Sequence, residues 1–226
     1  MKLTYYGHSC FSVVVNGKHL LFDPFITPNE LAKHIDVNQV KADYIFVSHG
    51  HEDHIADTVQ IAGNNDSMVV SNWEIINWAI NQGISNTHPM NIGGHWFFDF
   101  GKVKCVNAVH SSSLPDGSYG GNPMGFLVEA DERSFYYSGD TALTYDMKLI
   151  GEFKKMNFAL LPIGNNFTMG IDNAIIAAGY IGCEKIIGLH YDTYGYIKID
   201  RQEAIDKFSR AGKELLLPAI GETIEV

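Results

Sequence analysis

Four side chains that can bind metal ions fall within residues 49–54 of this sequence. They are His49, His51, Asp53 and His54, and they directly follow the apolar run 44–47. Residues two apart in an extended chain point to the same side, so His49 and His51 can share one cation, which leaves Asp53 and His54 for a second. Imidazole and carboxylate without thiolate suit zinc, manganese, iron or nickel. The run predicts half of a site for two divalent cations, with Zn²⁺ as the first expectation.

Three further candidate ligands each follow a predicted strand. His110 follows strand 103–109, Asp140 follows strand 135–137, and His190 follows strand 185–189. Segments after strand ends often carry functional side chains. Because one carboxylate can bridge two cations, Asp140 is the natural shared ligand. Taken alone, Asp140 is as well explained as a turn residue, and each histidine as a buried, hydrogen-bonded one.

Such a ligand set predicts hydrolytic chemistry. A water molecule between two divalent cations loses its proton at a pKa of about 7, which is far below that of bulk water. The hydroxide can attack a carbonyl or phosphorus atom, while a cation stabilises the oxyanion or the leaving group. Asp53 can both bind metal and orient the nucleophile, and we name Asp53 and His190 as catalytic residues. No Ser/His/Asp arrangement is evident in the sequence.

Short strands and helices alternate along all 226 residues. Strands are predicted first in each half, including a hairpin across Asn16-Gly17 and another across Gly101-Lys102. Helices are predicted over 73–80, with Trp73, Ile76 and Ile80 on one face, over 171–180, capped by Asp172, and over 201–210. This order suits an α+β protein with two mixed sheets packed together and helices outside, an αββα sandwich. We expect a single domain over residues 1–226.

Three polar residues are expected to contact a substrate. They are His8, which follows a strand, and Asn166 and Thr168, which follow another. Structural roles explain them equally well, as a hydrogen-bonded histidine and as a capped turn. The glycine-rich segment 111–123, next to His110, is predicted to be a flexible loop that covers the substrate, although an ordinary connection fits its composition too.

The charge balance limits the expected partners. Sixteen basic and 26 acidic residues give a formal net charge of −10. Such a chain repels phosphate backbones, so a nucleic-acid partner is not expected. Two divalent cations would reverse the charge locally, so a small substrate, an anionic one included, is compatible. A homo-oligomer is equally compatible.

The sequence predicts no membrane-spanning segment and no secretion signal. No apolar run approaches the length that spans a bilayer, and the first residues do not form a signal peptide. Cys10, Cys105 and Cys183 lie far apart without metal-binding spacing. They are predicted to be reduced and buried. A cytoplasmic protein without membrane contact is expected.

The order of these motifs resembles the metallo-β-lactamase superfamily. More narrowly, the chain is similar to a family of bacterial and archaeal metal-dependent hydrolases with no settled substrate, and more distantly to the L-ascorbate phosphate lactonases. The residues that carry the narrow resemblance span most of the chain: Gly7 to Phe11, Asp23 to Phe25, His49 to His54, His110 to Ser113, Tyr137 to Thr141, Leu161 to Gly164, Asn166 to Gly170, and His190-Tyr191.

The resemblance implies a four-layer metallo-β-lactamase-like fold with the site at one edge of the sandwich. It implies one metal on His49, His51 and His110, a second on Asp53, His54 and His190, and Asp140 between them. Where this family usually has aspartate, position 165 of this chain is Asn165. That difference puts an acid–base or metal-binding role for this position in doubt.

Several functions are compatible with this fold. A hydrolase of a small ester, lactone or phosphoester is the first hypothesis. A di-iron redox enzyme would prefer a carboxylate at His51 and would need an electron-transfer module. An RNA-processing nuclease would need a basic surface or an added arm, and a binding protein with a vestigial site would have lost ligands. β-Lactam hydrolysis is disfavoured because Asp140 stands where typical zinc β-lactamases have cysteine.

Overall fold

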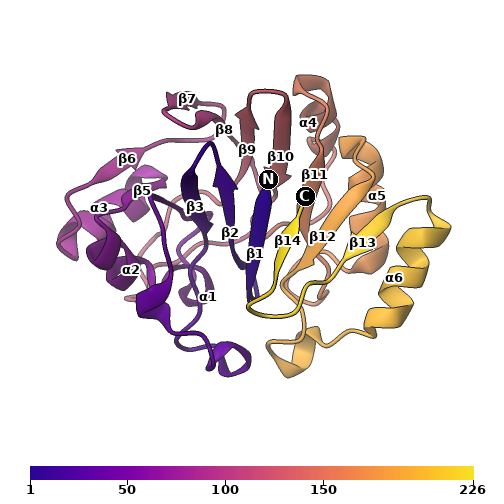
Figure 1. Ribbon diagram of the computed structural model, residues 1–226, viewed down its shortest axis with the longest axis horizontal. Helices are drawn as coiled ribbons and strands as arrows, with labels where there is room; N and C mark the ends of the chain where they lie inside the picture. The colour runs from indigo at the N-terminus through magenta and orange to yellow at the C-terminus, as the bar shows by residue number, and fades with distance from the viewer.

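Two sheets of seven strands pack face to face in the computed structural model, which describes residues 1–226 (Figure 1). The first sheet, in spatial order, contains β14 (Thr223–Glu225), β1 (Lys2–Gly7), β2 (Cys10–Val15), β3 (Lys18–Phe22), β4 (Tyr44–Phe46), β5 (Met68–Ser71) and β6 (Thr87–Pro89). The second contains β13 (Glu214–Leu216), β12 (Lys185–Leu189), β11 (Phe158–Pro162), β10 (Arg133–Tyr137), β9 (Met124–Ala130), β8 (Gly101–Asn107) and β7 (His95–Phe98).

Helices cover the outer face of each sheet, so the predicted αββα sandwich is confirmed (Figure 1). On the first sheet lie α1 (Glu52–Ile55), α2 (Thr58–Asn65) and α3 (Trp73–Asn81). On the second lie α4 (Met147–Phe153), α5 (Ile171–Ile181) and α6 (Arg201–Arg210). Three short 3₁₀ helices complete the chain: η1 (Glu30–Ala32), η2 (Val37–Gln39) and η3 (Gly195–Ile197).

A core of 24 buried residues fills the space between the sheets. Aromatic rings dominate it: Phe22 stacks on Phe11 and Phe46, with ring centroids 4.7 and 5.0 Å apart. Phe126 and Tyr137 of the second sheet meet Phe22 edge to face. Such rings remove a large apolar area from water and favour these offset geometries, so they fix the two sheets against each other.

Strand direction brings the candidate ligands to one rim of the sandwich. β3, β4 and β5 are parallel, as are β10, β11 and β12. β8 runs in the direction of β10, because both are antiparallel to β9. The carboxyl ends of parallel strands meet at one edge, so the segments after β3, β4, β8, β10 and β12 lie together. Ligand sites in sheets of this kind commonly lie beyond the carboxyl ends of the strands.

Three local predictions were wrong. Trp73 and Ile80 are exposed, and α3 instead buries Ile75, Ile76 and Ala79. The helix is apolar on most sides, so periodicity alone did not select the buried face. Asp172 lies in the first turn of α5, where Gly170 is the N-cap. The hairpin between β7 and β8 pairs Phe98 with Gly101, so the turn comes before Gly101.

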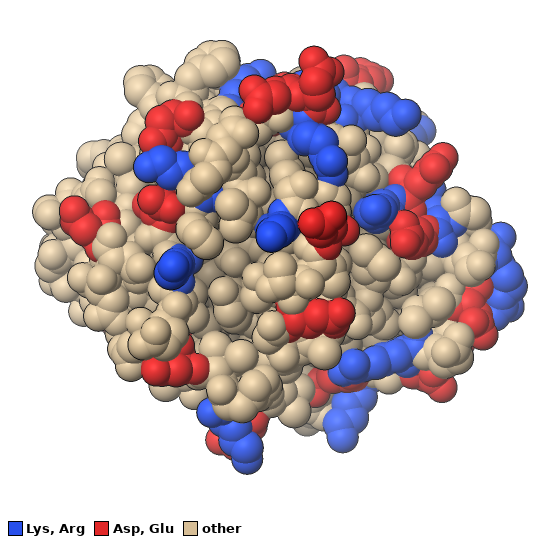
Figure 2. Space-filling view, in the orientation of Figure 1, with Lys and Arg blue, Asp and Glu red and all other residues tan.

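Acidic and basic side chains are interspersed on the face drawn in Figure 2, where neither sign forms a continuous patch. No helix has the length and hydropathy needed to cross a membrane. The three cysteines are free and buried, as predicted.

Candidate metal centre

The segment after β4 presents four of the seven predicted ligands. It has no regular secondary structure from Val47 to Gly50, His51 has an extended backbone, and α1 then begins at Glu52 with His51 as its N-cap. This backbone brings His49 and His51 together, whereas the first helical turn carries Asp53 and His54. A short helix directly after a non-helical segment therefore divides four neighbouring residues between two groups.

The first group contains His49, His51 and His110, each of which offers one ring nitrogen, and these three nitrogens lie within 4.8 Å of one another. His49 Nε2 and His51 Nδ1 are 3.0 Å apart. Two imidazole nitrogens bound to one tetrahedral zinc ion, at its usual bond lengths, lie about 3.3 Å apart. The group therefore has nearly the geometry that one cation requires.

The second group contains His8, Asp53, His54 and His190, again within 4.8 Å of one another. The Asp53 Oδ2 atom lies 3.8 Å from both His54 Nε2 and His190 Nε2. His190 directly follows β12 in a left-handed conformation, with φ 55°, and this turns its ring back over the rim. A non-glycine residue adopts such a conformation only when the surrounding structure fixes it.

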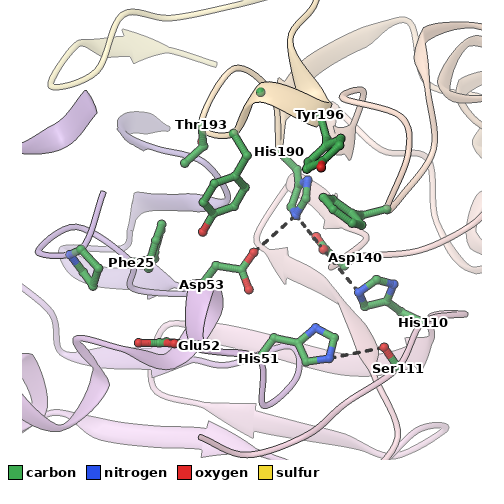
Figure 3. A pocket seen from close by; sticks show the side chains of 14 residues that line it. Phe25, His51, Glu52, Asp53, His110, Ser111, Asp140, His190, Thr193 and Tyr196 are labelled. Carbon is green, nitrogen blue, oxygen red and sulfur yellow. Dashed lines mark hydrogen bonds and ion pairs between the residues drawn. The ribbon is translucent and has the colours of Figure 1, made fainter. Parts of the chain in front are cut away.

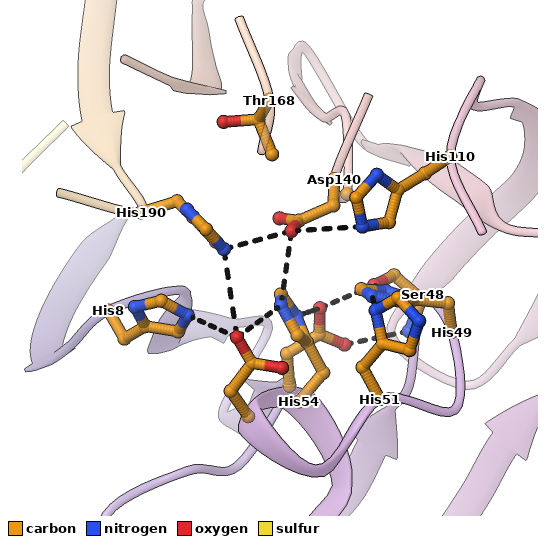
Figure 4. Close-up of polar contacts among 12 residues, drawn as sticks. His8, Ser48, His49, His51, His54, His110, Asp140, Thr168 and His190 are labelled. Atoms are coloured by element: carbon orange, nitrogen blue, oxygen red, sulfur yellow. Dashed lines mark hydrogen bonds and ion pairs between the residues drawn. The ribbon is translucent and has the colours of Figure 1, made fainter. Parts of the chain in front are cut away.

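Asp140 lies between the two groups (Figure 4). Its Oδ2 atom is 2.9 Å from His190 Nε2 and 3.4 Å from His54 Nε2 in the second group. The same atom is 3.7 Å from His110 Nε2 in the first group. The structure thus brings all seven predicted ligands together, with Asp140 in the position of a shared one.

Unpaired polar atoms at the centre fit a bound cation. His54 Nε2 and Asp140 Oδ1 are buried without hydrogen-bond partners. Leaving such atoms unpaired costs about 1–3 kcal/mol each, and native proteins seldom leave them so. A cation would satisfy the imidazole nitrogen, and histidine with carboxylate is the donor set that zinc accepts. His190 Nδ1 is also buried and unpaired, on the side of the ring away from Asp140.

The protonation states also suit metal binding. Burial alone would raise the pKa of Asp53 and Asp140, but neighbouring histidines hold both values below the usual range. Burial lowers the pKa of His49 well below its ordinary value. Burial would also lower the pKa of His54 and His190, yet the carboxylates raise both, that of His190 to about 9. Cation binding would displace those protons, because ligands bind in their deprotonated forms.

Asp23 orients two of the ligands from behind, and sequence analysis did not assign it a role. Its Oδ2 atom accepts hydrogen bonds from His54 Nδ1 at 2.7 Å, from Ser48 Oγ and from Tyr137 OH. Its Oδ1 atom accepts from the Ser48 backbone N–H at 2.7 Å. With four bonds, this carboxylate is already satisfied. It holds the Nδ1 proton of His54 and so directs Nε2 toward the centre.

Ser48 fixes the tautomer of His49, as Asp23 fixes that of His54. Its hydroxyl gives its one proton to Asp23, so its oxygen can only accept from His49 Nδ1, which is 2.9 Å away. His49 is therefore protonated at Nδ1 and free at Nε2. Asp23 and Tyr137 are 114 residues apart, so local sequence patterns could not predict their hydrogen bond. Their match to family motifs was the one sign in the sequence that either residue has a role.

His8 supports Asp53 and does not reach the substrate space. Its ring is buried, with Nε2 3.0 Å from Asp53 Oδ2 and Nδ1 2.9 Å from Thr193 Oγ1. The backbone carbonyl of His8 also accepts from the His190 N–H at 2.9 Å. Because both ring nitrogens are engaged, the expectation that His8 contacts substrate is not supported.

A cavity of about 910 Å³ opens above the centre (Figure 3). Neither Asn166 nor Thr168 lines it, although their neighbour Phe167 does, so these two expected substrate contacts are not supported either. The lining consists of Phe25, Pro28, His51, Glu52, Asp53, His110, Ser111, Asp140, Phe167, His190, Thr193, Tyr194, Gly195 and Tyr196.

Asn165 is a turn residue in this structure. It has a φ of 63°, which asparagine tolerates better than most residues. Its N–H donates to the Met169 carbonyl at 3.0 Å, and Gly170 packs against its side chain. Asn165 lies outside the cavity lining and belongs to the turn that carries Phe167.

The segment 111–123 packs against the histidine run and does not cover the cavity. The Gly50 N–H donates to Ser112 Oγ at 3.1 Å, and the Asn72 side chain donates to the Gly120 carbonyl at 2.8 Å. A side chain at Gly50 would meet the Ser113 carbonyl at 3.0 Å. Only Ser111 reaches the cavity. The expectation of a covering loop was wrong, because hydrogen bonds hold this segment beside the centre.

Comparisons with known proteins find relatives over nearly the whole chain. The model of the beta-lactamase superfamily domain matches residues 18–191. A protein of Flavobacterium johnsoniae, named as a UPF0173 metal-dependent hydrolase, is 56% identical over all of both chains. A protein of the same name from Bacillus cereus is 44% identical over 99% of both chains. A metallo hydrolase of the archaeon Ignicoccus hospitalis has 34% identity and a TM-score of 0.88, and the match covers 99% of this chain and 97% of that one.

Proposed function

Because this chain belongs to the beta-lactamase superfamily and is a metal-dependent hydrolase, we propose that it uses two divalent cations, first of all Zn²⁺, to hydrolyse a small ester, lactone or phosphoester. His49, His51 and His110 would hold one cation, and Asp53, His54 and His190 the other. Asp140 would bridge them. The position of Asp140 Oδ2, 2.9 Å from His190 and 3.7 Å from His110, is the observation that carries this proposal.

When bound, the two cations would lower the pKa of a shared water molecule to about 7 and so supply hydroxide at neutral pH. Every hydrogen bond and ion pair of Asp53 uses Oδ2, which leaves Oδ1 free to orient that water. Hydrolysis would add the water oxygen to the acyl carbon or phosphorus and a proton to the leaving oxygen as its bond breaks. Asp53 Oδ1 would hold that proton and deliver it to the leaving oxygen.

The chain's own contribution is to fix these groups before substrate arrives. His8 holds Asp53, Asp23 holds His54, and Ser48 holds His49, each through a hydrogen bond that is buried or, for His8, partly buried. Groups that are already oriented cost little reorganisation during the reaction. The buried side of the centre also keeps bulk water away, because His49, His54 and His190 have almost no exposed surface.

A substrate panel on zinc-loaded protein tests the proposal. We expect hydrolysis of at least one member of a set of lactones, carboxylic esters, thioesters and phosphodiesters, and its loss after chelation. Asp140→Ala should remove the activity, whereas Asp172→Ala, an exposed aspartate that pairs only with Lys207, should keep it. Activity that survives both chelation and Asp140→Ala would refute the proposal.

A further inference from the structure

The wall of the cavity above the candidate metal centre contains no lysine or arginine. Its charged side chains, apart from the histidines, are the acids Glu52, Asp53 and Asp140. Arg201 lies nearby but is engaged elsewhere: its Nε is 3.0 Å from Asp192, and its guanidinium lies over the Tyr191 ring. Bound cations would accept negative charge at the reacting bond itself. A phosphate, sulfate or carboxylate farther along the substrate would meet no positive partner and would face Glu52.

Aromatic rings supply most of the remaining wall. Phe25 comes from the segment after β3, Phe167 from the turn after β11, and Tyr194 and Tyr196 from the segment after β12. Phe25 is buried at the base, with its ring 5.5 Å from that of His8. Figure 3 shows Phe25 and Tyr196 at two sides of the converging Asp53 and His190. Three separate segments thus each place a ring in one cavity.

Two of these rings lie at the mouth with large exposed surface. Phe167 is 50% exposed and Tyr196 is 79% exposed, and their centroids are 6.2 Å apart in an edge-to-face arrangement. Folding gains little from rings left in water, and neighbouring exposed rings beside a cavity commonly mark a binding surface.

The turn that carries Phe167 is also costly. Asn165 and Asn166 both have left-handed backbones, with φ values of 63° and 59°, and the Phe167 N–H donates back to the Asn165 carbonyl at 2.7 Å. Two such residues in succession hold backbone strain, even though asparagine tolerates this conformation better than most residues. Strain of this kind commonly accompanies functional sites, and here it places a phenyl ring at the mouth of the cavity.

From these observations, and resting on the proposed function, we propose that the cavity selects substrates whose non-reacting part is an uncharged aromatic group. The arene lies against the neighbouring rings of Phe167 and Tyr196 at the mouth, and the hydrolysable bond reaches the centre between Asp53 and Asp140. A volume of about 910 Å³ admits a molecule of this size. Tyr194 also lines the cavity, and its hydroxyl can donate to a substrate oxygen.

A binding experiment with four amides tests this selection directly. The probes are phenylacetamide, the aliphatic isovaleramide, 4-carboxyphenylacetamide and 4-(trimethylammonio)phenylacetamide, each titrated by NMR into zinc-loaded wild-type protein. Phenylacetamide should bind roughly tenfold more tightly than isovaleramide, a difference of about 1.4 kcal/mol from its contacts with the two mouth rings. The carboxylate should bind more weakly than phenylacetamide. Equal binding of phenylacetamide and isovaleramide, or tighter binding of the carboxylate or the ammonium probe, would overturn the proposal.

Variants assign the effect to the mouth. The double variant Phe167→Ala, Tyr196→Ala should bind phenylacetamide roughly tenfold more weakly, and Phe167→Leu should lose part of that affinity. Phe97→Ala is the matched control, because Phe97 is 69% exposed on β7 and lies outside the cavity. Both mouth residues are exposed, so these variants are expected to fold. An affinity that the double variant leaves unchanged would contradict the assignment.

The two proposals fail in different ways. If phenylacetamide binds at the mouth and no member of the hydrolysis panel is cleaved, aromatic selection stands and the proposed function fails. If esters are cleaved with the same kcat/KM whether their acyl group is phenylacetyl or isovaleryl, hydrolysis stands and aromatic selection is overturned.

Discussion

Asp140 and Phe167 line the same cavity, yet Asp140 is 2% exposed and Phe167 is 50% exposed. The centre around Asp140 is polar and buried, and its ligands are held from behind by Asp23, Ser48 and His8. The mouth around Phe167 is aromatic and in contact with solvent. Reaction chemistry needs charges fixed in place, whereas recognition of an apolar group needs only rings in the right place. The difference predicts that changes at the centre affect metal binding and turnover, and that changes at the mouth affect KM.

The largest effect is expected from His51→Ala. It removes a nitrogen 3.0 Å from His49 Nε2 and leaves the first group with two histidines. Loss of that cation should lower kcat/KM at least about a thousandfold, because the nucleophile depends on both ions. Elemental analysis should find about one zinc fewer per chain. The control His95→Ala changes an exposed histidine on β7 and should leave both values unchanged. Full activity in His51→Ala would show that the first group of histidines does not hold a catalytic cation.

Asp23→Asn tests the support behind the centre. The amide keeps the size of the side chain but cannot accept all four hydrogen bonds, including that from His54. Zinc affinity, measured by competition with a chelator, should fall about 10–100-fold. The free energy of unfolding in urea should fall by about 3 kcal/mol. Asp43→Asn, at a half-exposed aspartate that pairs with Lys18, is the matched control. An unchanged zinc affinity would make Asp23 a purely structural residue.

His8→Gln separates positioning from metal binding. Glutamine can still donate to Asp53, though without the fixed ring that spans Asp53 and Thr193. We expect kcat to fall roughly tenfold, with KM within twofold, because only the orientation of Asp53 changes. The bound zinc should remain at two ions per chain. Loss of one zinc in this variant would show that His8 is itself a ligand.

The smallest effect is expected at the mouth. Phe167→Ala should leave the zinc content unchanged and the free energy of unfolding within about 0.5 kcal/mol, because the ring is half in solvent. KM for an aryl ester should rise a few-fold, while kcat stays constant, since only binding of the non-reacting part is lost. A fall in kcat without a change in KM would contradict the claim that the mouth affects substrate binding alone.

The cluster of candidate ligands could be predicted from the sequence largely because four of its members are neighbours. The spacing within residues 49–54 is enough to place four side chains together. His110, Asp140 and His190 could be found because each follows a strand. The residues behind them could not be found this way. Asp23 follows β3 of the first sheet and Tyr137 ends β10 of the second, and nothing in the local pattern indicates that their side chains meet.

The mouth and the loops were harder to predict, for a different physical reason. The composition of 111–123 is the same whether hydrogen bonds hold the segment or not, and its partners Gly50 and Asn72 are distant in sequence. Phe167, Tyr194 and Tyr196 are not distinguishable by type from aromatic residues of the core. Their role depends on exposure beside a cavity, which only the assembled sheets create.

The number of metal ions in the wild-type protein tests the central claim most directly. The purified chain should be stripped with a chelator, repleted with Zn²⁺, freed of unbound metal and examined by elemental analysis. Two groups of histidine ligands on either side of Asp140 predict two zinc ions per chain. A content of one zinc or none after repletion would contradict the two-cation centre.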